Sequence, residues 1–415
     1  MGAIQLSYST FGLTNLDFLA AIDAVDRAGY DGIEISFHRD QFNPFDIDDD
    51  YLARVKARLD CARVKAACVA TASHFFTPQR PHEPSLMAVE PAARKRRIDL
   101  IKRGIHVARK LGVNLVTFGS GFIRAEHVAN PGVDPGELLA ESIRACLREI
   151  RDDEDITLLI EPEPGMYIET MAQGLALMRA VGSPKFKLHI DICHAYCSEP
   201  DYITALGEAA PHARYLHISD AREGYNLKIV QDSPNLALDL DFASTLVHFP
   251  DTCDYLLVDR DHPIHFRDQA PSRARQAYIE SVLASAGVQK DLSIVSYSGL
   301  YAGTSPLDDE IFTYLISIPG LSYDVLERAK PVVAYLRGAK PPPLVNKMVA
   351  NTLTGVVHFH EIPGEGTLDF AASFKALIDH GFSGYGSVEL YHHVESWEKA
   401  LSDSHRHLSQ FVAAP

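Results

Sequence analysis

The chain reads TLLIE at 157–161, KLHID at 187–191 and RYLHIS at 214–219, with longer amphipathic stretches between these runs. Each run is short, apolar and rich in Leu or Ile, which is typical of a buried strand. Strands that alternate with helical stretches in this way pair in parallel, because a parallel connection needs a long crossover. This part of the chain therefore predicts repeated βα units around a parallel sheet.

The same alternation extends in both directions from these three runs. Five further runs read as strands: IQLSYS (4–9), GIEIS (32–36), VKAACVAT (64–71), VNLVTF (113–118) and YGSVEL (385–390). The first seven strands recur at intervals close to the ~31 residues per unit of a (β/α)8 barrel. Asn15 stands where it can cap the first helix. We therefore predict an α/β fold, specifically a (β/α)8 TIM barrel.

The regular spacing fails once, between the seventh and the eighth strand. Residues 223–355 are too many for a loop, so we predict an inserted α/β subdomain there, with the barrel at 1–222 and 356–415. The insertion contains two strand-like and two helix-like runs: 255–260, 292–298, 272–287 and 326–338. Insertions in such barrels collect in the loops that build the active site. A lid, a partner-docking surface and a dimerisation element are all open roles for it.

Composition restricts the partners and the compartment. The chain has 415 residues, 46% of them hydrophobic, and a formal charge of −16. Nucleic acids and anionic membranes attract basic surfaces, so neither is expected as a partner. The sequence shows no apolar run of ~20 residues, no signal-peptide pattern and no paired cysteine motif. We expect a soluble, cytoplasmic protein with reduced thiols.

Four residues that can bind a metal fall on consecutive strands. Glu161, Asp191, His217 and Glu389 lie within or near the ends of the fifth to eighth strands. In a parallel barrel those ends share one mouth, so the four side chains are expected to converge. A single carboxylate at a strand end is more often a helix cap or a salt-bridge partner, but four in apolar runs would be costly without a cation. We predict one divalent ion, with Mn favoured and Mg, Co, Zn or Fe possible.

Other polar residues are predicted to line the same mouth and to bind the substrate there. Glu34 lies in the second strand, His74 and His82 follow the third, and His360 stands, with His358, where the chain re-enters the barrel. The histidines can contact a substrate or carry a proton, since imidazole titrates near neutrality. A buried histidine that is simply hydrogen-bonded within the core is the alternative for each.

Five segments of the chain resemble a known family. They are IEPEPGMYIET (160–170), HIDICH (189–194), LHISDAR (216–222), HFHEIPGEGTLDF (358–370) and GSVELY (386–391). Their residues and their order are similar to those of the sugar phosphate isomerase/epimerase family of xylose isomerase-like barrels. That family includes ketose 3-epimerases, inosose dehydratases and, more distantly, endonuclease IV. The resemblance covers about 1–222 and 356–412.

The resemblance implies the same metal ligands. In the family pattern the first Glu of the fifth-strand motif is the ligand, which selects Glu161 over Glu163. The Asp of DxxH, the His of HxxD and the eighth-strand Glu complete the set as Asp191, His217 and Glu389.

Two further positions match family residues that contact a substrate. His194 matches a histidine that orients the substrate or a ligand. Arg222 matches an arginine that often binds a substrate oxygen or phosphate, and its planar fork suits either. The alternatives are a core histidine for His194 and a surface salt bridge for Arg222.

The function implied by this resemblance is a divalent-metal-dependent isomerase or epimerase. Its small-molecule substrate is a sugar, sugar phosphate or cyclitol, and it passes through an enediolate while Glu161 and Glu389 remove and return the proton. One alternative is a lyase using the same site, of the inosose dehydratase or C-glycoside deglycosidase type. Another is a non-catalytic metabolite-binding or assembly protein. A DNA-repair endonuclease is disfavoured by the acidic balance, and a homodimer is possible.

Overall fold

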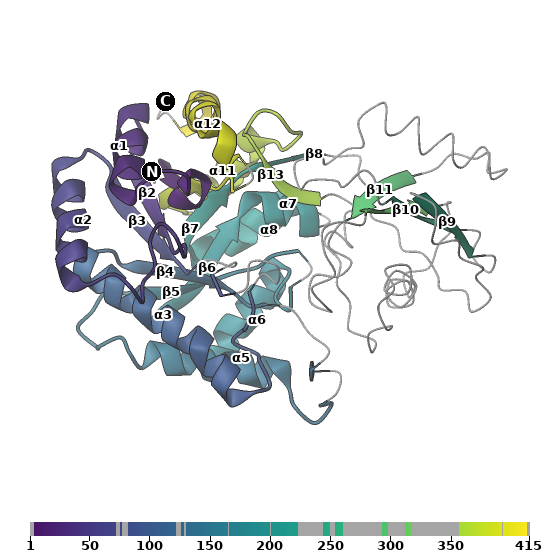
Figure 1. Ribbon diagram of the computed structural model, residues 1–415, viewed down its shortest axis with the longest axis horizontal. Helices are drawn as coiled ribbons and strands as arrows, with labels where there is room; N and C mark the ends of the chain where they lie inside the picture. Colours follow the sequence, from purple (N-terminus) through teal and green to yellow (C-terminus); the bar gives the residue numbers. More distant parts are fainter. Residues whose placement is uncertain are drawn as a thin grey trace.

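The computed structural model describes most of the barrel and four strands of the segment before the last barrel unit. The described residues are 4–71, 75–76, 82–121, 126–127, 130–164, 166–199, 201–222, 357–391 and 393–412, with strands at 244–249, 254–259, 293–297 and 312–317. Figure 1 shows the barrel strands surrounded by helices.

Eight parallel strands close into a barrel, as predicted. Their order around it is β1-β14-β7-β6-β5-β4-β3-β2. The strands are β1 (Ile4–Ser9), β2 (Gly32–Ser36), β3 (Lys65–Ala70), β4 (Leu115–Gly119), β5 (Thr157–Glu161), β6 (Phe186–Asp191), β7 (Ala213–Ile218) and β14 (Gly384–Val388). The barrel therefore closes between the first and the last of these strands in the sequence.

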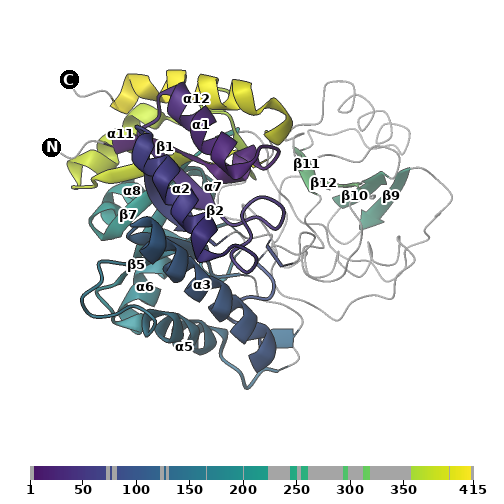
Figure 2. The ribbon, with the colours of Figure 1, turned by 60° about the vertical axis from the view of Figure 1, so that its left-hand side comes forward.

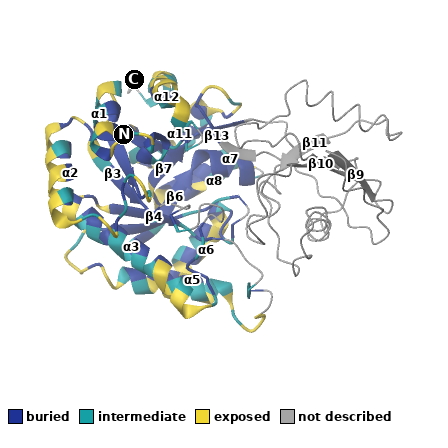
Figure 3. Cartoon of the chain, in the orientation of Figure 1, coloured by how far each residue is buried: buried dark blue, intermediate teal, exposed yellow. Residues whose placement is uncertain are grey.

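Amphipathic helices cover the outside of the barrel. They are α1 (Phe18–Ala28), α2 (Asp49–Cys61), α3 (Pro91–Leu111), α5 (Pro135–Leu147), α6 (Met171–Val181), α8 (Tyr202–Ala209), α11 (Phe370–Asp379) and α12 (Trp397–Val412). The short helix α7 (Ile192–Ser198), directly after β6, is instead almost entirely buried. Figure 3 shows buried residues in the strands and exposed residues on the outer faces of helices such as α2 and α5. No helix in this described set is long and apolar enough to cross a membrane.

The first and last helices lie side by side where the barrel closes (Figure 2). The Tyr30 hydroxyl, after α1, donates to the Leu401 carbonyl in α12 at 2.8 Å. The predicted cap of α1 was wrong. Asp17 caps this helix, accepting from the backbone N–H groups of Leu19 and Ala20, whereas the Asn15 amide donates to the Val394 carbonyl at 3.1 Å. The helix begins at Phe18, which puts Asn15 too far upstream to reach its first turn.

Strand alternation decides which side chains enter the barrel. Residues two apart on a strand share a face, so His189 and Asp191 of β6 point inward while Leu188 and Ile190 pack in the apolar core. The register then aligns neighbouring strands, with Asp191 opposite His217 and Ser387 of β14 also opposite His217. Polar side chains of several strands therefore meet at one level.

The described strands between β7 and β14 include a separate sheet. β9 (Ser244–Phe249), β10 (Asp254–Asp259), β11 (Ser293–Tyr297) and β12 (Phe312–Ser317) pair antiparallel in the order β11-β12-β10-β9. β10 and β11 coincide with the two predicted strand-like runs. The helix-like runs at 272–287 and 326–338 lie outside the described residues, and the domain bounds at 223 and 355 stay a prediction.

The chain re-enters the barrel on a short antiparallel pair, β8 (Asp220–Arg222) with β13 (Val357–Glu361). The glycine-rich turn after β13 wraps the Asp220 carboxylate, which accepts from the N–H groups of Gly364 at 2.9 Å, Gly366 at 2.9 Å and Leu368 at 3.0 Å. A Cβ on Gly366 would overlap that carboxylate. The glycines thus serve a turn, and the turn holds β13 beside β8, just after the end of β7.

Candidate metal centre

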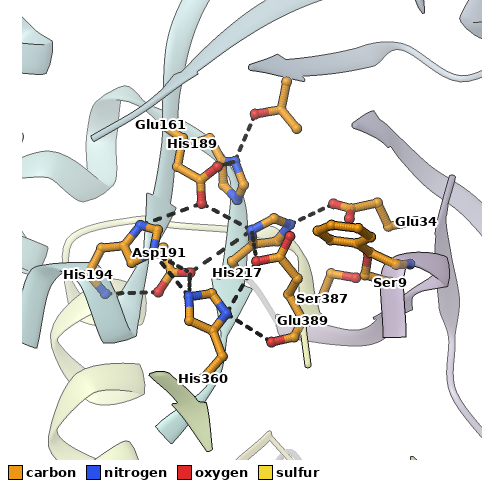
Figure 4. A network of polar contacts seen from close by, with 12 residues as sticks. Ser9, Glu34, Glu161, His189, Asp191, His194, His217, His360, Ser387 and Glu389 are labelled. Carbon is orange, nitrogen blue, oxygen red and sulfur yellow. Dashed lines mark hydrogen bonds and ion pairs between the residues drawn. The ribbon is translucent and has the colours of Figure 1, made fainter. Parts of the chain in front are cut away.

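The four predicted ligands come from four consecutive barrel units. Glu161 ends β5, Asp191 ends β6, His217 lies near the end of β7 and Glu389 directly follows β14. Figure 4 shows their side chains directed toward one another from these strands. The barrel alternation accounts for this convergence, because all four occupy inward positions at the carboxyl ends of parallel strands.

Three carboxylates surround one imidazole nitrogen. The Nδ1 atom of His217 is 3.0 Å from Glu161 Oε1, 3.5 Å from Glu389 Oε2 and 4.0 Å from Asp191 Oδ2. The Asp191 and His217 side chains are 0% and 2% exposed, whereas Glu161 and Glu389 keep 13% and 14%. One nitrogen and three oxygen ligand atoms therefore face one point. Of the four side chains, the two glutamates are the more exposed to solvent.

The donor set fits a divalent cation. Asp191 Oδ2 is buried and has no hydrogen-bond partner among the described residues. Its neighbours are ring nitrogens, His194 Nε2 at 3.7 Å, His360 Nε2 at 3.9 Å and His217 Nδ1 at 4.0 Å, all beyond hydrogen-bond distance. An unsatisfied buried carboxylate oxygen is costly. A cation among these atoms would satisfy it, and oxygen-rich sets with one imidazole suit Mn, Mg or Co.

Glu34 fixes the tautomer of His217. The Glu34 carboxylate is fully buried in the described structure, and its Oε2 lies 2.7 Å from His217 Nε2. That acceptor favours the hydrogen on Nε2, so a neutral ring presents the Nδ1 lone pair to the other carboxylates. The sequence predicted a substrate contact for Glu34. In the structure Glu34 is fully buried behind His217, the usual place of a carboxylate that supports a histidine ligand, and its substrate contact stays a prediction.

Without a cation, protons hold the cluster together. Burial raises the pKa of Glu161 to about 8, and the positive charge of His217 only partly opposes this rise. Burial would lower the pKa of His217, but the charges of Glu34, Glu389 and Glu161 outweigh it and hold that pKa well above its usual value. At neutral pH a cation must therefore displace protons from its own ligands.

We expect metal affinity to rise with pH for this reason. Between about pH 6 and pH 8 the Mn²⁺ association constant should increase by about tenfold per pH unit for each proton displaced, and the slope contributed by Glu161 should flatten above its pKa of about 8. Calorimetric titrations in two buffers with different protonation enthalpies would count the protons released. An affinity that is constant over this range would contradict the proton-filled site.

His194 and His360 form a second layer beside Asp191. Their Nε2 atoms are 3.1 Å apart, so one ring must donate to the other. His194 Nδ1 lies 3.2 Å from the Pro162 carbonyl, which favours its hydrogen there. Burial would lower the pKa of His360, but its bond to Glu389 and the charges of Asp191 and Glu389 raise it to about 10. His360 is therefore the donor, and both predicted residues do reach the site.

Two of the site histidines have a left-handed backbone. His360 has φ 52° and His82 has φ 62°, a region that costs non-glycine residues energy and recurs at functional sites. His82 Nε2 lies 3.4 Å from Glu163 Oε2. A Cβ on Gly119, the last residue of β4, would collide with the His82 ring. The loop after β3 therefore brings His82 to the barrel mouth, next to the second Glu of the fifth-strand motif.

Three predicted positions are not described at the side-chain level. His74 lies outside the described residues, and for Arg222 and His358 only the backbone is described. Their substrate contacts therefore stay predictions.

Sequence reasoning missed His189. Its ring is fully buried, with Nδ1 2.8 Å from Thr117 Oγ1 and 3.6 Å from Glu161 Oε2. Burial, together with the positive charges of His217 and His194, holds the pKa of His189 well below its usual value, so the ring is neutral. The signal was present, because His189 stands two residues before Asp191 and shares its face of the strand.

Three groups of side chains each bring ligand atoms within 4.8 Å of one another, and two of these groups share His217. They are Glu161–His189–His217, Glu34–His217–Glu389 and Asp191–His194–His360. Each predicted ligand belongs to at least one of them, yet none contains all four. A cation would fit best at His217 Nδ1, because His217 Nε2 already bonds Glu34, His189 Nδ1 bonds Thr117, and His360 donates to His194.

A family model described as xylose isomerase-like TIM barrel matches residues 22–264, more than half of the chain. The chain belongs to this family. The predicted barrel and the resemblance noted in the sequence are thereby confirmed. Among solved structures, the fold is similar to that of the IolI protein described with a bound zinc atom, with a TM-score of 0.54 and 13% sequence identity. The match covers 99% of this chain and 98% of the IolI chain. A xylose isomerase domain protein from Alicyclobacillus acidocaldarius subsp. acidocaldarius is 12% identical with a TM-score of 0.52, covering 99% of this chain and 100% of its own.

One curated relative is a sugar epimerase. The L-ribulose 3-epimerase of Mesorhizobium japonicum is 25% identical over 204 residues, which are 48% of this chain and 63% of the relative. The chain thus matches less than two thirds of that enzyme's length. Relatives of this chain therefore include sugar epimerases.

Proposed function

We propose that the chain is a divalent-metal-dependent isomerase or epimerase acting on a sugar, sugar phosphate or cyclitol. The observation that carries this proposal is the meeting of three carboxylates at the Nδ1 atom of an imidazole whose tautomer Glu34 fixes. Membership of the xylose isomerase-like family and the relation to L-ribulose 3-epimerase support it.

Glu161, Asp191, His217 and Glu389 would hold the ion. When bound, a divalent cation supplies Lewis-acid stabilisation of the negative charge that develops on substrate oxygens as a proton leaves carbon. Mn²⁺ is our first choice, since the set offers three oxygens and one nitrogen.

We assign the proton transfers to Glu161 and Glu389. Both side chains keep a small exposure, 13% and 14%, while Asp191 is fully buried, so the two glutamates are the carboxylates that a substrate at the mouth can meet. They come from β5 and from the end of β14, on different sides of His217. One would remove a proton from carbon and the other would return it. Which glutamate does which depends on the substrate's configuration.

The rim of the site would bind the rest of the substrate. Tyr391 stacks on Phe11 with ring centroids 5.4 Å apart and meets the His360 ring at 4.9 Å, which gives an apolar wall beside Glu389. Aromatic faces suit the carbon-bound hydrogens of a sugar. We further propose that His194, His360 and His82, with His74 and Arg222, contact substrate oxygens.

Incorporation of solvent deuterium into the substrate tests the reaction directly. Metal-loaded protein is incubated in D2O with a panel of ketoses, their phosphates and inososes, and products are analysed by NMR. An isomerase or epimerase should place deuterium at the reacting carbon and yield the stereoisomer or the aldose. Loss of a hydroxyl or another leaving group would indicate the lyase instead. No exchange into any of these substrates, with metal bound, would contradict the proposal and favour a binding role.

A further inference from the structure

His189 lies directly beside Glu161, although neither proton transfer uses it. It stands on β6, with its ring fully buried and its Nδ1 3.6 Å from Glu161 Oε2 (Figure 4). The ring is edge-on to the His217 ring, with centroids 4.1 Å apart and an interplanar angle of 81°. His189 thus contacts two candidate ligands from inside the barrel.

The two oxygens of Glu161 have different neighbours. Oε1 lies 3.0 Å from His217 Nδ1, where the other carboxylates gather, whereas Oε2 faces His189. Rotation about the last side-chain bond would exchange these oxygens. A neighbour that holds Oε2 therefore decides which oxygen faces the cation and in which plane the carboxylate lies.

The His189 ring is itself held in place. Its Nδ1 lies 2.8 Å from the Thr117 hydroxyl, which comes from β4. The Tyr215 ring packs against it, with centroids 5.0 Å apart. Side chains of β4 and β7 thus fix the imidazole of β6. A small movement of the Glu161 carboxylate would bring Oε2 within hydrogen-bond distance of Nδ1.

We propose that His189, held by Thr117, is a positioning residue that orients the Glu161 carboxylate with Oε1 toward the cation. The proposal rests on the metal site of the proposed function. Positions that support ligands typically change metal affinity by 10–100-fold when they are lost. His189 would thus set both the affinity of the site and the orientation of one of its two proton-transfer groups.

Three substitutions separate positioning from packing. His189→Asn puts a side-chain amide where the ring carries Nδ1, and His189→Gln puts the amide near the position of Nε2. His189→Leu fills the space without a polar atom. The dissociation constant for Mn²⁺ is measured on each metal-free protein by competition with a chelator. We expect His189→Asn to stay within about threefold of the unchanged protein, and His189→Gln and His189→Leu to bind about 10–100-fold more weakly.

Thr117 provides a second pair of variants, which also serves if a residue at 189 prevents folding. Thr117→Val should weaken Mn²⁺ binding in the same direction, and Thr117→Ser, which keeps the hydroxyl, should restore it. If His189→Leu and His189→Asn had the same affinity for Mn²⁺, whether tight or weak, the proposal would be overturned. It would also be overturned if the unchanged protein bound no Mn²⁺. The binding measurement needs no substrate. A chain that binds Mn²⁺ but acts on no sugar would therefore contradict the proposed function without contradicting this inference.

Discussion

Glu161→Gln and Glu389→Gln should each lower kcat by about 10²–10⁴-fold on any sugar that the chain accepts, because an amide cannot take a proton from carbon. The two side chains are the candidate ligands that keep 13% and 14% exposure at the mouth. Gln has nearly the same size and still offers one oxygen, so both variants should fold. Initial rates at Mn²⁺ concentrations that saturate each variant measure the loss of proton transfer separately from weaker metal binding.

Glu398→Gln is the matched control for these two variants. Glu398 is exposed in the first turn of α12, so the same chemical change there should leave kcat unaltered. If either Glu161→Gln or Glu389→Gln, saturated with metal, turned over like the control, the acid–base assignment would be wrong for that residue.

Glu34→Leu should weaken Mn²⁺ binding by about 10–100-fold, although Glu34 is not itself a proposed ligand. Its carboxylate lies 2.7 Å from His217 Nε2 and is fully buried. Leu removes the acceptor that keeps the hydrogen on Nε2, so the ring can turn or protonate at Nδ1 and cease to be a ligand. Equilibrium competition with a chelator would measure the loss.

Glu34→Gln separates the hydrogen bond from the charge. Its amide oxygen can still accept from Nε2, so we expect an affinity between those of Glu34→Leu and the unchanged protein. If Glu34→Leu bound Mn²⁺ as tightly as the unchanged protein, the orienting role would be refuted and Glu34 would be a buried core residue only.

The ligand positions were predictable because two simple rules of parallel barrels locate them. Inward side chains alternate along a strand, and parallel strands share one carboxyl end, so Asp191 and His217 could be placed together from the sequence. The same rule would have found His189, two residues before Asp191. The contact of Glu34 with His217 was not predictable, because β2 and β7 are not neighbouring strands and no register aligns their residues.

Local choices were also beyond the sequence. Asn15 and Asp17 are both acceptable helix caps, and the choice depends on where Phe18 begins the helix against the core. His360 reaches Glu389 because Asp220 binds the glycine-rich turn and because His360 adopts φ 52°. Neither the binding of Asp220 to this turn nor the left-handed backbone of His360 produces a periodic pattern in the sequence.

The metal content of the purified protein is the most direct test of the account. Protein prepared without chelator or nickel affinity would be analysed by elemental mass spectrometry, beside Glu389→Gln and His217→Ala, and again after loading with Mn²⁺ and Mg²⁺. The account predicts about one divalent ion per chain in the unchanged protein and its loss or marked weakening in both variants. A chain that holds no ion under any loading condition, or variants that hold it as tightly as the unchanged protein, would contradict the metal centre at His217.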